Sequence, residues 1–391
     1  MADRDFSSVL SAIESVLGLQ RRPVALHEPR FNGREWDYVK ECLDSGWVSS
    51  GGDFVVKLEG MLADYTGARF AVATVNGTAA LHVCLRVMDV MPGDEVLIPT
   101  LTFIATATAV AYCGATPHFA DSDETTMGLD PNKLDGYLRD IAVIRDGACV
   151  NRLTGARIRV VVPMHTFGHP VDLDPLVEVC ARYQLQLVED AAESLGSFYK
   201  GRHTGTIGKV SALSFNGNKI ITTGGGGAVL TNDEQLAKTI KHLTTTARVA
   251  HRWSYIHDQV GYNYRLPNIN AALGCAQLEQ LPRFLELKRR LAARYLGVFA
   301  GVGWAKIFRE PAYAKSNYWL NTLLLDEAHA DVRDDLLDFT NQHGILTRPV
   351  WTLMHRLPMF TSCPRMDLST AESIEKRLIN LPSSAILGAA A

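Results

Sequence analysis

A lysine and a run of glycines stand close together near the middle of the 391-residue chain. Lys219 follows an apolar run that predicts a strand over residues 210–215, and glycines occupy positions 224–227. A lysine partly buried beyond a strand has a lowered pKa and can form an imine with a carbonyl group. A solvated surface lysine and a simple glycine turn are the alternatives. A nucleotide-phosphate loop is excluded, because the lysine of such a loop follows its glycines.

Carboxylates end another expected strand, over residues 185–189. Glu189 and Asp190 stand at its end, and Glu193 follows three residues later. An acid at this position could keep the nitrogen of a pyridine ring protonated and make the ring an electron sink. It could equally bind a metal ion or cap the next helix. The pattern alone leaves these roles open.

The turn at residues 76–79 lies between an expected strand and an expected helix. It contains Gly77, Thr78 and Ala79. The unpaired N–H groups and the positive dipole end of a helix N-terminus suit a phosphate, and the Thr78 hydroxyl can add a donor. A capped helix without a ligand is the alternative, since asparagine and threonine are good caps.

Other residues allow chemistry without indicating one role. Phe103 could stack on a planar cofactor or belong to the core. His165 and His169 are spaced like a metal-binding pair, but no third ligand follows at a suitable spacing, so no metal site is predicted. Asn263 lies in a polar and aromatic stretch that could form an interface or contact a phosphate.

Short apolar runs alternate with helical patterns from about residue 70, which predicts an α/β fold with a mostly parallel sheet and helices on both faces. Ligands of such sheets bind beyond the carboxyl ends of the strands, where the residues above are expected. This alternation of apolar runs and helical patterns changes near residues 260–285, which indicates a smaller α+β C-terminal domain. We therefore predict an N-terminal amphipathic helix within 1–22, a large domain over 23–260 and a small domain over 261–391.

Individual elements follow from the same patterns. Strands are expected at residues 69–74, 95–99, 116–120, 159–164, 185–189, 210–215, 318–325 and 344–348. Helices are expected at residues 6–18, 78–88, 104–112, 331–343 and 268–299, the last as one helix or as two interrupted at Pro282.

Composition excludes several classes of protein. A formal net charge of -3 gives no electrostatic reason to expect nucleic acid or an anionic membrane as a partner. The seven cysteines include no C-x-x-C pair, which speaks against a disulfide framework or a zinc knuckle and fits a reducing compartment. No apolar run approaches the ~20 residues of a membrane span, and the N-terminus is not a secretory signal. A cytoplasmic protein is expected.

The motifs occur in an order that closely resembles the DegT/StrS family of sugar aminotransferases, from about Glu28 to Ser384. The matching blocks are S-G-W-V-S-S-G (45–51), N-G-T-A-A-L-H (76–82), P-T-L-T-F-I-A-T (99–106), H-T-F-G (165–168), E-D-A-A-E-S-L-G-S (189–197), S-F-N-G-N-K-I-I-T-T-G-G-G-G (214–227) and G-Y-N-Y-R-L-P (261–267). The resemblance implies PLP fold type I, like that of aspartate aminotransferase. It also implies a homodimer with shared active sites and pyridoxal 5'-phosphate as cofactor, in the pyridoxamine 5'-phosphate form during turnover.

The resemblance further implies roles around the cofactor ring. Lys219 would carry the cofactor as a Schiff base, Asp190 would pair with the pyridine nitrogen, and Phe103 would lie against the ring face. Glu193 stands where many members carry a glutamine near the ring hydroxyl. A carboxylate there would be repelled unless it is protonated or turned away, so its role stays open.

The phosphate of the cofactor would be held at the other end of the ring. The resemblance places Gly77, Thr78 and Ala79 there, together with Ser214, whose hydroxyl stands five residues before the lysine. Asn263 would reach the phosphate from the neighbouring subunit, which makes the dimer a requirement for activity.

Three phrases are most similar to the branch that acts on 4-keto-6-deoxy N-acetylglucosamine nucleotides. They are V-V-P-M-H-T-F-G-H-P (161–170), S-N-Y-W-L-N (316–321) and R-P-V-W-T-L-M (348–354). The implied reaction transfers the amino group of L-glutamate to the C4 ketone of a UDP-2-acetamido-2,6-dideoxy-4-keto-hexose. Its product would be UDP-4-amino-4,6-dideoxy-N-acetylglucosamine, a precursor of bacillosamine or legionaminic acid.

Alternatives to this activity remain within the same fold. The sugar nucleotide could carry GDP or dTDP, and a sugar dehydratase or a non-catalytic regulatory relative is possible, although a lysine at position 219 favours transamination. His165 and Arg348 are candidate substrate contacts. The Arg348 guanidinium can bind a carboxylate or a phosphate, or form a structural salt bridge.

Overall fold

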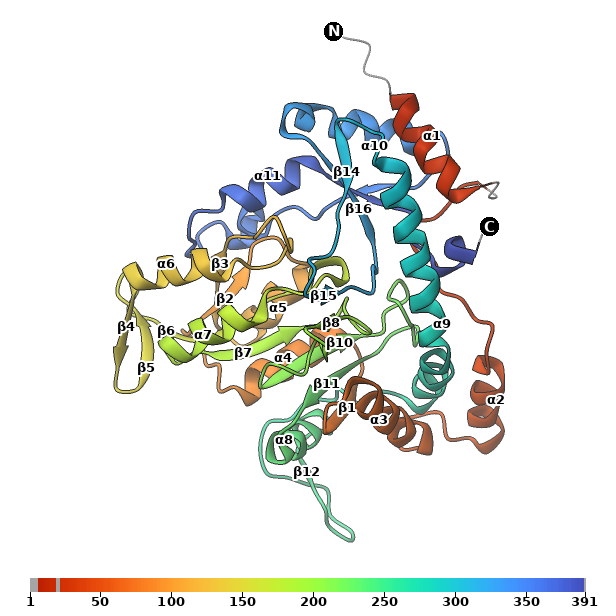
Figure 1. Cartoon of the computed structure of the whole chain (residues 1–391). Helices are drawn as coiled ribbons and strands as arrows, with labels where there is room; N and C mark the ends of the chain where they lie inside the picture. The colour runs from red at the N-terminus through yellow and green to blue at the C-terminus, as the bar shows by residue number, and fades with distance from the viewer. Residues whose placement is uncertain (1–5, 19–21, 390–391) are drawn as a thin grey trace.

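A mixed sheet forms the centre of the larger part of the molecule, in a computed structural model that describes residues 6–18 and 22–389 (Figure 1). Its main path runs in the order β1 (Phe70–Thr74), β11 (Gly227–Thr231), β10 (Val210–Ser214), β7 (Gln186–Asp190), β6 (Arg157–Val161), β2 (Glu95–Pro99) and β3 (Thr116–Ala120). β11 is antiparallel to both neighbours, and the other pairs along this path are parallel. A hairpin of β4 (Ala142–Arg145) and β5 (Ala148–Asn151) joins beside β6. The predicted α/β fold is confirmed.

Helices cover both faces of this sheet, because alternate residues of each strand point to opposite sides. Val96 and Ile98 of β2 pack with the helices of one face, whereas Leu97 packs with those of the other. The first face is covered by α4 (Gly77–Val87), α5 (Ile104–Tyr112) and α8 (Glu234–Thr244). The second is covered by α6 (Pro131–Ile141), α7 (Leu173–Tyr183), α2 (Glu35–Ser45), α3 (Asp53–Thr66) and α9 (Asn268–Phe299).

Several predicted elements have the limits that the sequence indicated, namely β2, β3 and α5. The strand predicted at 159–164 ends earlier, as β6, because Pro163 cannot donate to a strand ladder. β11 was not predicted, since the glycines at 224–227 indicated only a turn. The strand predicted at 344–348 is found only in part: Ile345 forms an isolated parallel bridge with Val24, and Arg348–Pro349 pairs with a later strand as β17.

A second, antiparallel sheet lies in the C-terminal part of the chain. Its order is β14 (Ala305–Ile307), β16 (Asn321–Leu325), β18 (Leu378–Leu381) and β17 (Arg348–Pro349). The helices α10 (Arg333–Gln342) and α11 (Ser369–Arg377) pack beside it. The predicted N-terminal amphipathic helix is α1 (Phe6–Leu17), and its apolar side packs against this sheet and against α9.

The helix α9 connects the two parts of the molecule, as Figure 1 shows. Its first half packs against α2 and α3, whereas Leu291 and Tyr295 near its end pack with α1 and the second sheet. Pro282 lies inside the helix without ending it, although proline removes one donor from the helix ladder. The domain limits therefore stay a prediction, since α9 belongs to both apolar clusters. Within the described ranges, no helix is long and apolar enough to cross a membrane.

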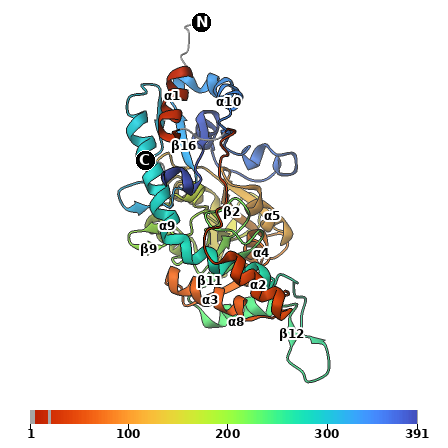
Figure 2. The same ribbon diagram turned by 90° about the vertical axis from the view of Figure 1, so that its right-hand side faces the viewer.

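A hairpin of β12 (Arg248–Val249) and β13 (Ile256–His257) projects from the body of the molecule beyond α8, as both views show (Figures 1 and 2). Between its strands, Trp253 and Tyr255 are 76% and 78% exposed. Large aromatic side chains exposed on a projecting loop are typical of surfaces that contact another molecule.

Candidate active site

A cavity of about 340 Å³ lies at the carboxyl ends of β7 and β10, where parallel sheets place their ligand sites. Most of the predicted cofactor residues line it, namely Gly77, Thr78, Phe103, Asp190, Glu193, Ser214 and Lys219. The tertiary structure therefore brings together residues from segments that are far apart in the sequence.

The N-terminus of α4 forms one end of the cavity. Asn76 caps this helix, because its side-chain oxygen accepts a hydrogen bond from the Ala79 N–H at 2.7 Å. Ala79 thus contributes to the cap, while Gly77 and Thr78 line the cavity. A Cβ atom on Gly77 would lie 2.8 Å from the Cβ atom of Ser214, so glycine allows α4 to approach the end of β10. A helix N-terminus beside a hydroxyl group can bind a phosphate.

Asp190 ends β7 and is 2% exposed. Its Oδ2 atom accepts a hydrogen bond from the Thr106 hydroxyl at 2.6 Å, and its Oδ1 atom accepts one from the Ala192 N–H at 3.2 Å. Burial raises the pKa of the Asp190 carboxyl, although these hydrogen bonds and the Lys219 charge favour its ionised form. Such a carboxyl group gains stability from a cationic nitrogen placed against it.

Lys219 and Glu193 face each other in the cavity. The Lys219 Nζ atom lies 2.9 Å from Glu193 Oε1 and 4.0 Å from the ring centre of Trp319. The other carboxylate oxygen of Glu193 accepts the Phe167 N–H at 2.9 Å. Burial raises the pKa of Glu193, while the charge and hydrogen bond of Lys219 oppose this change. The cavity thus holds a primary amine with a carboxyl group in direct contact.

Aromatic side chains form a further part of the cavity wall. Phe103 is 46% exposed and lines the cavity, so it does not belong to the core. Trp351 lies with its ring centre 5.9 Å from that of Phe103, and Trp319 is held by a hydrogen bond from its indole N–H to the Asn218 carbonyl at 2.7 Å. Trp319 and Trp351 were not predicted as site residues. Both stand in quoted phrases of the C-terminal part, but no spacing in the sequence connects them with Lys219.

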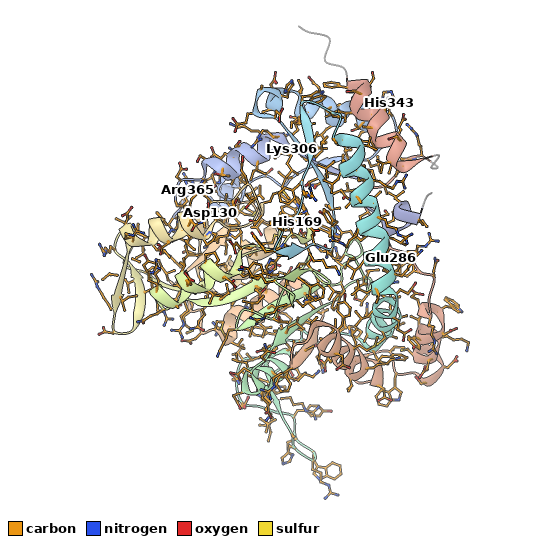
Figure 3. All side chains as sticks on the ribbon, in the orientation of Figure 1. Asp130, His169, Glu286, Lys306, His343 and Arg365 are labelled. Atoms are coloured by element: carbon orange, nitrogen blue, oxygen red, sulfur yellow. The ribbon has the colours of Figure 1, made fainter. Side chains whose placement is uncertain are left out.

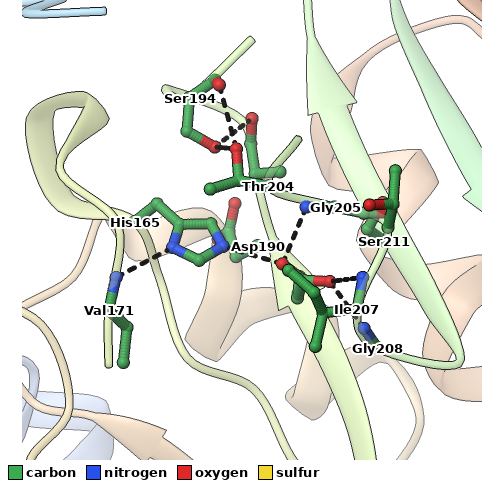
Figure 4. A network of polar contacts seen from close by, with 12 residues as sticks. His165, Val171, Asp190, Ser194, Thr204, Gly205, Ile207, Gly208 and Ser211 are labelled. Atoms are coloured by element: carbon green, nitrogen blue, oxygen red, sulfur yellow. Dashed lines mark hydrogen bonds and ion pairs between the residues drawn. The ribbon is translucent and has the colours of Figure 1, made fainter. Parts of the chain in front are cut away.

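His165 does not line the cavity, and it belongs to a buried network of polar contacts that Figure 4 shows. Its Nδ1 atom accepts the Val171 N–H at 3.2 Å, so Nε2 carries the proton and donates to Glu189 Oε2 at 3.0 Å. Glu189 also accepts N–H groups of the loop 205–208 at 2.6 to 2.8 Å. Burial raises the pKa of Glu189, but these hydrogen bonds outweigh it and the pKa is lowered. The main-chain N–H of His165 donates to the main-chain carbonyl of Asp190 at 3.1 Å, so His165 supports the position of Asp190.

His169 lies in the interior of the molecule (Figure 3). Its ring centre is 4.6 Å from that of Phe308 and 5.2 Å from that of Tyr318, and burial lowers its pKa to about 3. In the ranges that the structure describes, no group of three or more histidine, cysteine, aspartate or glutamate side chains is arranged to hold a metal ion.

A neighbouring cavity of about 490 Å³ shares Asn218, Trp319 and Trp351 with the first one. Arg348 lines it and is exposed. Its Nη1 atom donates to Asn341 Oδ1 at 2.9 Å and to the Thr347 carbonyl at 2.7 Å. The guanidinium therefore lies near the amine-bearing cavity without lining it.

Asn263 is exposed and does not line the cavity of its own chain. Its Oδ1 atom accepts hydrogen bonds from Nε and Nη2 of Arg265 at 3.1 and 2.9 Å. It follows the β12–β13 hairpin in the chain and forms an isolated antiparallel bridge with Thr245, next to the end of α8.

Comparison with known proteins identifies relatives over nearly the whole chain. The family model described as the DegT/DnrJ/EryC1/StrS aminotransferase family covers residues 29–390. A GDP-perosamine synthase of Caulobacter vibrioides is 39% identical over 365 residues, which are 93% of each chain. A GDP-perosamine synthase of Escherichia coli O157:H7 is 37% identical over 360 residues, 92% of this chain and 93% of the other.

A solved structure resembles the fold over nearly the whole chain. The protein Spr1654 of Streptococcus pneumoniae, in its PLP-form, has a TM-score of 0.82 at 25% identity and covers 91% of this chain and 92% of its own. Pyridoxal phosphate is therefore the cofactor, and the cavity contains the groups that it requires. These are a helix N-terminus with a hydroxyl group for the phosphate, a buried carboxyl group, an aromatic face and a primary amine.

Replacing Gly77 by alanine should weaken the binding of pyridoxal phosphate. The new methyl group would overlap Ser214 and separate α4 from β10, at a cost of ~1–3 kcal/mol. We expect the dissociation constant of the cofactor to rise about tenfold, since ~1.4 kcal/mol is a factor of ten. Equilibrium dialysis of the cofactor measures this change. Gly60→Ala in α3 is the control, because a Cβ atom there meets nothing within 4 Å, and equal affinities of the two variants would contradict the prediction.

Proposed function

We propose, from the premise that this chain belongs to the DegT/DnrJ/EryC1/StrS aminotransferase family, that it transfers an amino group from L-glutamate to the C4 ketone of a sugar nucleotide. The observation that carries the proposal is the buried amine of Lys219, held at the strand ends beside Asp190 and a helix N-terminus. The chain is a pyridoxal phosphate-dependent transaminase. The residue roles, the donor and the acceptor are the proposed part.

Each group of the cavity has a task in this reaction. When it is bound, pyridoxal phosphate supplies an electrophilic carbon and a ring that accepts electrons. Lys219 provides the amine for covalent attachment, and the same amine moves a proton once it is released. Asp190 keeps a proton on the ring nitrogen, and Phe103 restricts the ring to one plane. The N-terminus of α4 and Ser214 hold the phosphate.

The closed walls of the cavity support proton transfer by Lys219. Trp319 lies over the amine and excludes water from one side, while Glu193 fixes the amine on the other. An amine held in this way would be positioned to move a proton when the cofactor is bound. Arg348 in the neighbouring cavity is our candidate for binding a carboxylate of glutamate or a phosphate of the nucleotide, since its guanidinium can donate two parallel hydrogen bonds.

The relatives support a GDP-linked acceptor. Both quoted sequences are named for GDP-perosamine, which is a 4-amino-4,6-dideoxyhexose joined to GDP. We therefore propose a GDP-linked 4-keto-6-deoxyhexose as the first substrate. The UDP-linked N-acetyl sugar that the sequence phrases favoured is the second, because these relatives do not support it.

A homodimer with shared active sites is part of the proposal. Asn263 is exposed and outside the cavity of its own chain, and the projecting hairpin presents Trp253 and Tyr255. Burial of these side chains against a second copy would remove a large apolar surface from water. The same contact would bring Asn263 to the phosphate end of the other copy's cavity.

Replacing Lys219 by alanine should abolish transamination. The variant lacks the amine for attachment and for proton transfer, so we expect kcat to fall by at least the ~10²–10⁴-fold that a positioned acid–base group contributes. The visible absorbance of the lysine-bound cofactor should disappear as well. Lys209→Ala is the control, because Lys209 is an exposed lysine outside the cavity. Normal turnover by the Lys219 variant would disprove the proposed function.

The nucleotide can be identified by running the reaction in reverse. We expect 2-oxoglutarate to accept the amino group from a GDP-4-amino-4,6-dideoxyhexose with the highest kcat/KM in a panel of GDP-, UDP- and dTDP-linked 4-amino sugars. Formation of glutamate measures each rate. A preference for the UDP-linked N-acetyl sugar would instead support the second substrate.

Shared active sites can be tested by mixing inactive variants. Lys219→Ala removes the amine from its own cavity, whereas Asn263→Ala would remove a contact from the partner's cavity. Heterodimers formed by co-expression should regain activity, because one cavity then has an intact Lys219 and receives an intact Asn263. The rate of the co-expressed pair, compared with each variant alone, gives the result. No gain over the separate variants would contradict the shared site.

A further inference from the structure

Glu193 is the cavity residue whose chemistry the proposed function leaves unexplained. It is 3% exposed, and both of its carboxylate oxygens are engaged. Oε2 accepts the Phe167 N–H at 2.9 Å, which turns Oε1 toward the Lys219 Nζ atom at 2.9 Å. Asn317 holds the main chain of Glu193 by donating to its carbonyl at 2.8 Å. The carboxyl group therefore has one fixed direction, toward the amine.

The pair is largely shielded from water. Lys219 is 9% exposed, and the Trp319 ring covers its Nζ atom. In such surroundings a charged amine and carboxylate lose hydration, whereas a neutral amine and carboxylic acid lose much less. Burial raises the pKa of the Glu193 carboxyl, which favours its protonated form.

We propose that Glu193 is the proton partner of Lys219: it accepts a proton from the lysine ammonium when a neutral amine is needed, and it returns that proton afterwards. In the forward step an N–H bond at Nζ breaks and an O–H bond at Oε1 forms. The positive and the negative charge disappear together, and no further reactant is required. The neutral amine can then attack a carbonyl carbon or take up a proton from carbon. This inference rests on the proposed function and specifies how its lysine is activated.

Other titratable groups face this pair from neighbouring segments. The Asp190 charge raises the pKa of Glu193 further. Burial, and then the charges of Lys288 and Lys219, lower the pKa of His27 well below its ordinary value. Burial lowers the pKa of Lys288 to about 7. Among the described residues, however, Glu193 alone is hydrogen-bonded to the Lys219 Nζ atom.

Lys288 helps to hold Trp319, whose ring covers the Lys219 amine of the pair. It is fully buried in α9 and donates to His27 Nε2 at 3.0 Å, to the Trp319 carbonyl at 3.0 Å and to the Ser383 carbonyl at 2.6 Å. These bonds fix the main chain at Trp319. They do not supply a proton acceptor for Lys219, which leaves this task to Glu193.

The first test measures the Lys219 amine in the full-length chain from which the cofactor has been removed. An amine-selective acylating reagent labels the neutral amine only, and peptide mass spectrometry follows the labelling of Lys219 against pH. In Glu193→Gln, the amide keeps the shape and the acceptor for Phe167 but carries no charge. We expect the midpoint of labelling to move to lower pH, because the ammonium loses the carboxylate that it contacts in the wild-type chain.

Glu59→Gln is the matched control. Glu59 of α3 accepts a hydrogen bond from Lys241 at 2.6 Å and thus forms a lysine–glutamate pair outside the cavity. Its replacement should leave the Lys219 midpoint unchanged. If the Glu193 carboxyl does not act on the proton of Lys219, Glu193→Gln also leaves the midpoint unchanged, and the inference is then wrong.

The second test uses the cofactor-loaded enzyme and small carboxylates. Glu193→Ala removes the acceptor and leaves space beside the amine, so the half-reaction with glutamate should slow about 10²-fold. Added formate should restore part of the rate and formamide should not, because only formate can accept the proton. Equal effects of both additives would overturn the inference. The proposed function fails separately, if wild-type enzyme does not transaminate or if Lys219→Ala does.

Discussion

The register between β7, β10 and β11 determines the dimensions of the cavity. Asp190 pairs with Ala212 of β10, so the acid and Ser214 leave the same edge of the sheet on adjacent strands. β11 runs antiparallel on the other side of β10, and a Cβ atom on Gly227 would lie 2.7 Å from the backbone of Asn76. This close approach brings the N-terminus of α4 to the strand ends. A shift of one residue would turn the acid to the opposite face of the sheet.

Electrostatic balance explains why these groups tolerate burial. A buried ion without a partner costs several kcal/mol. Asp190 is compensated by a hydroxyl and an N–H donor, and Glu193 by an N–H donor and the amine of Lys219. Two places in the cavity would stabilise a charged group of a ligand. A cation would be stabilised beside Asp190, and an anion would be stabilised at the N-terminus of α4. A cofactor with a basic ring nitrogen and a phosphate group fits both.

The C-terminal part completes the cavity, although it contributes none of the cofactor residues predicted for it from this chain. It supplies Trp319 over the lysine and Trp351 opposite Phe103. The helix α9 holds both parts together, and its buried Lys288 ties the main chain at Trp319 to the segments of His27 and Ser383. Movement of the C-terminal part would therefore uncover the amine.

The sequence by itself determined the local features of this protein. Apolar periodicity indicated β1, β2, β3, β7 and β10 together with α4 and α5, but not α6 or the β4–β5 hairpin. The ordered motifs indicated Lys219, Asp190 and the turn before α4. The predicted strands, helices and cap are confirmed, because these elements depend on residues that are close in the chain, whereas the roles of Lys219 and Asp190 stay predictions. Only the tertiary structure decided the position of β11 in the sheet, the position of His165 outside the cavity lining and the contact of Glu193 with Lys219. The tertiary structure alone also decided the hydrogen bond from Trp319 to the carbonyl of Asn218, which is 101 positions away in the chain. Such contacts arise when the whole sheet and α9 pack together, and no period or spacing along the chain encodes which distant side chains then meet.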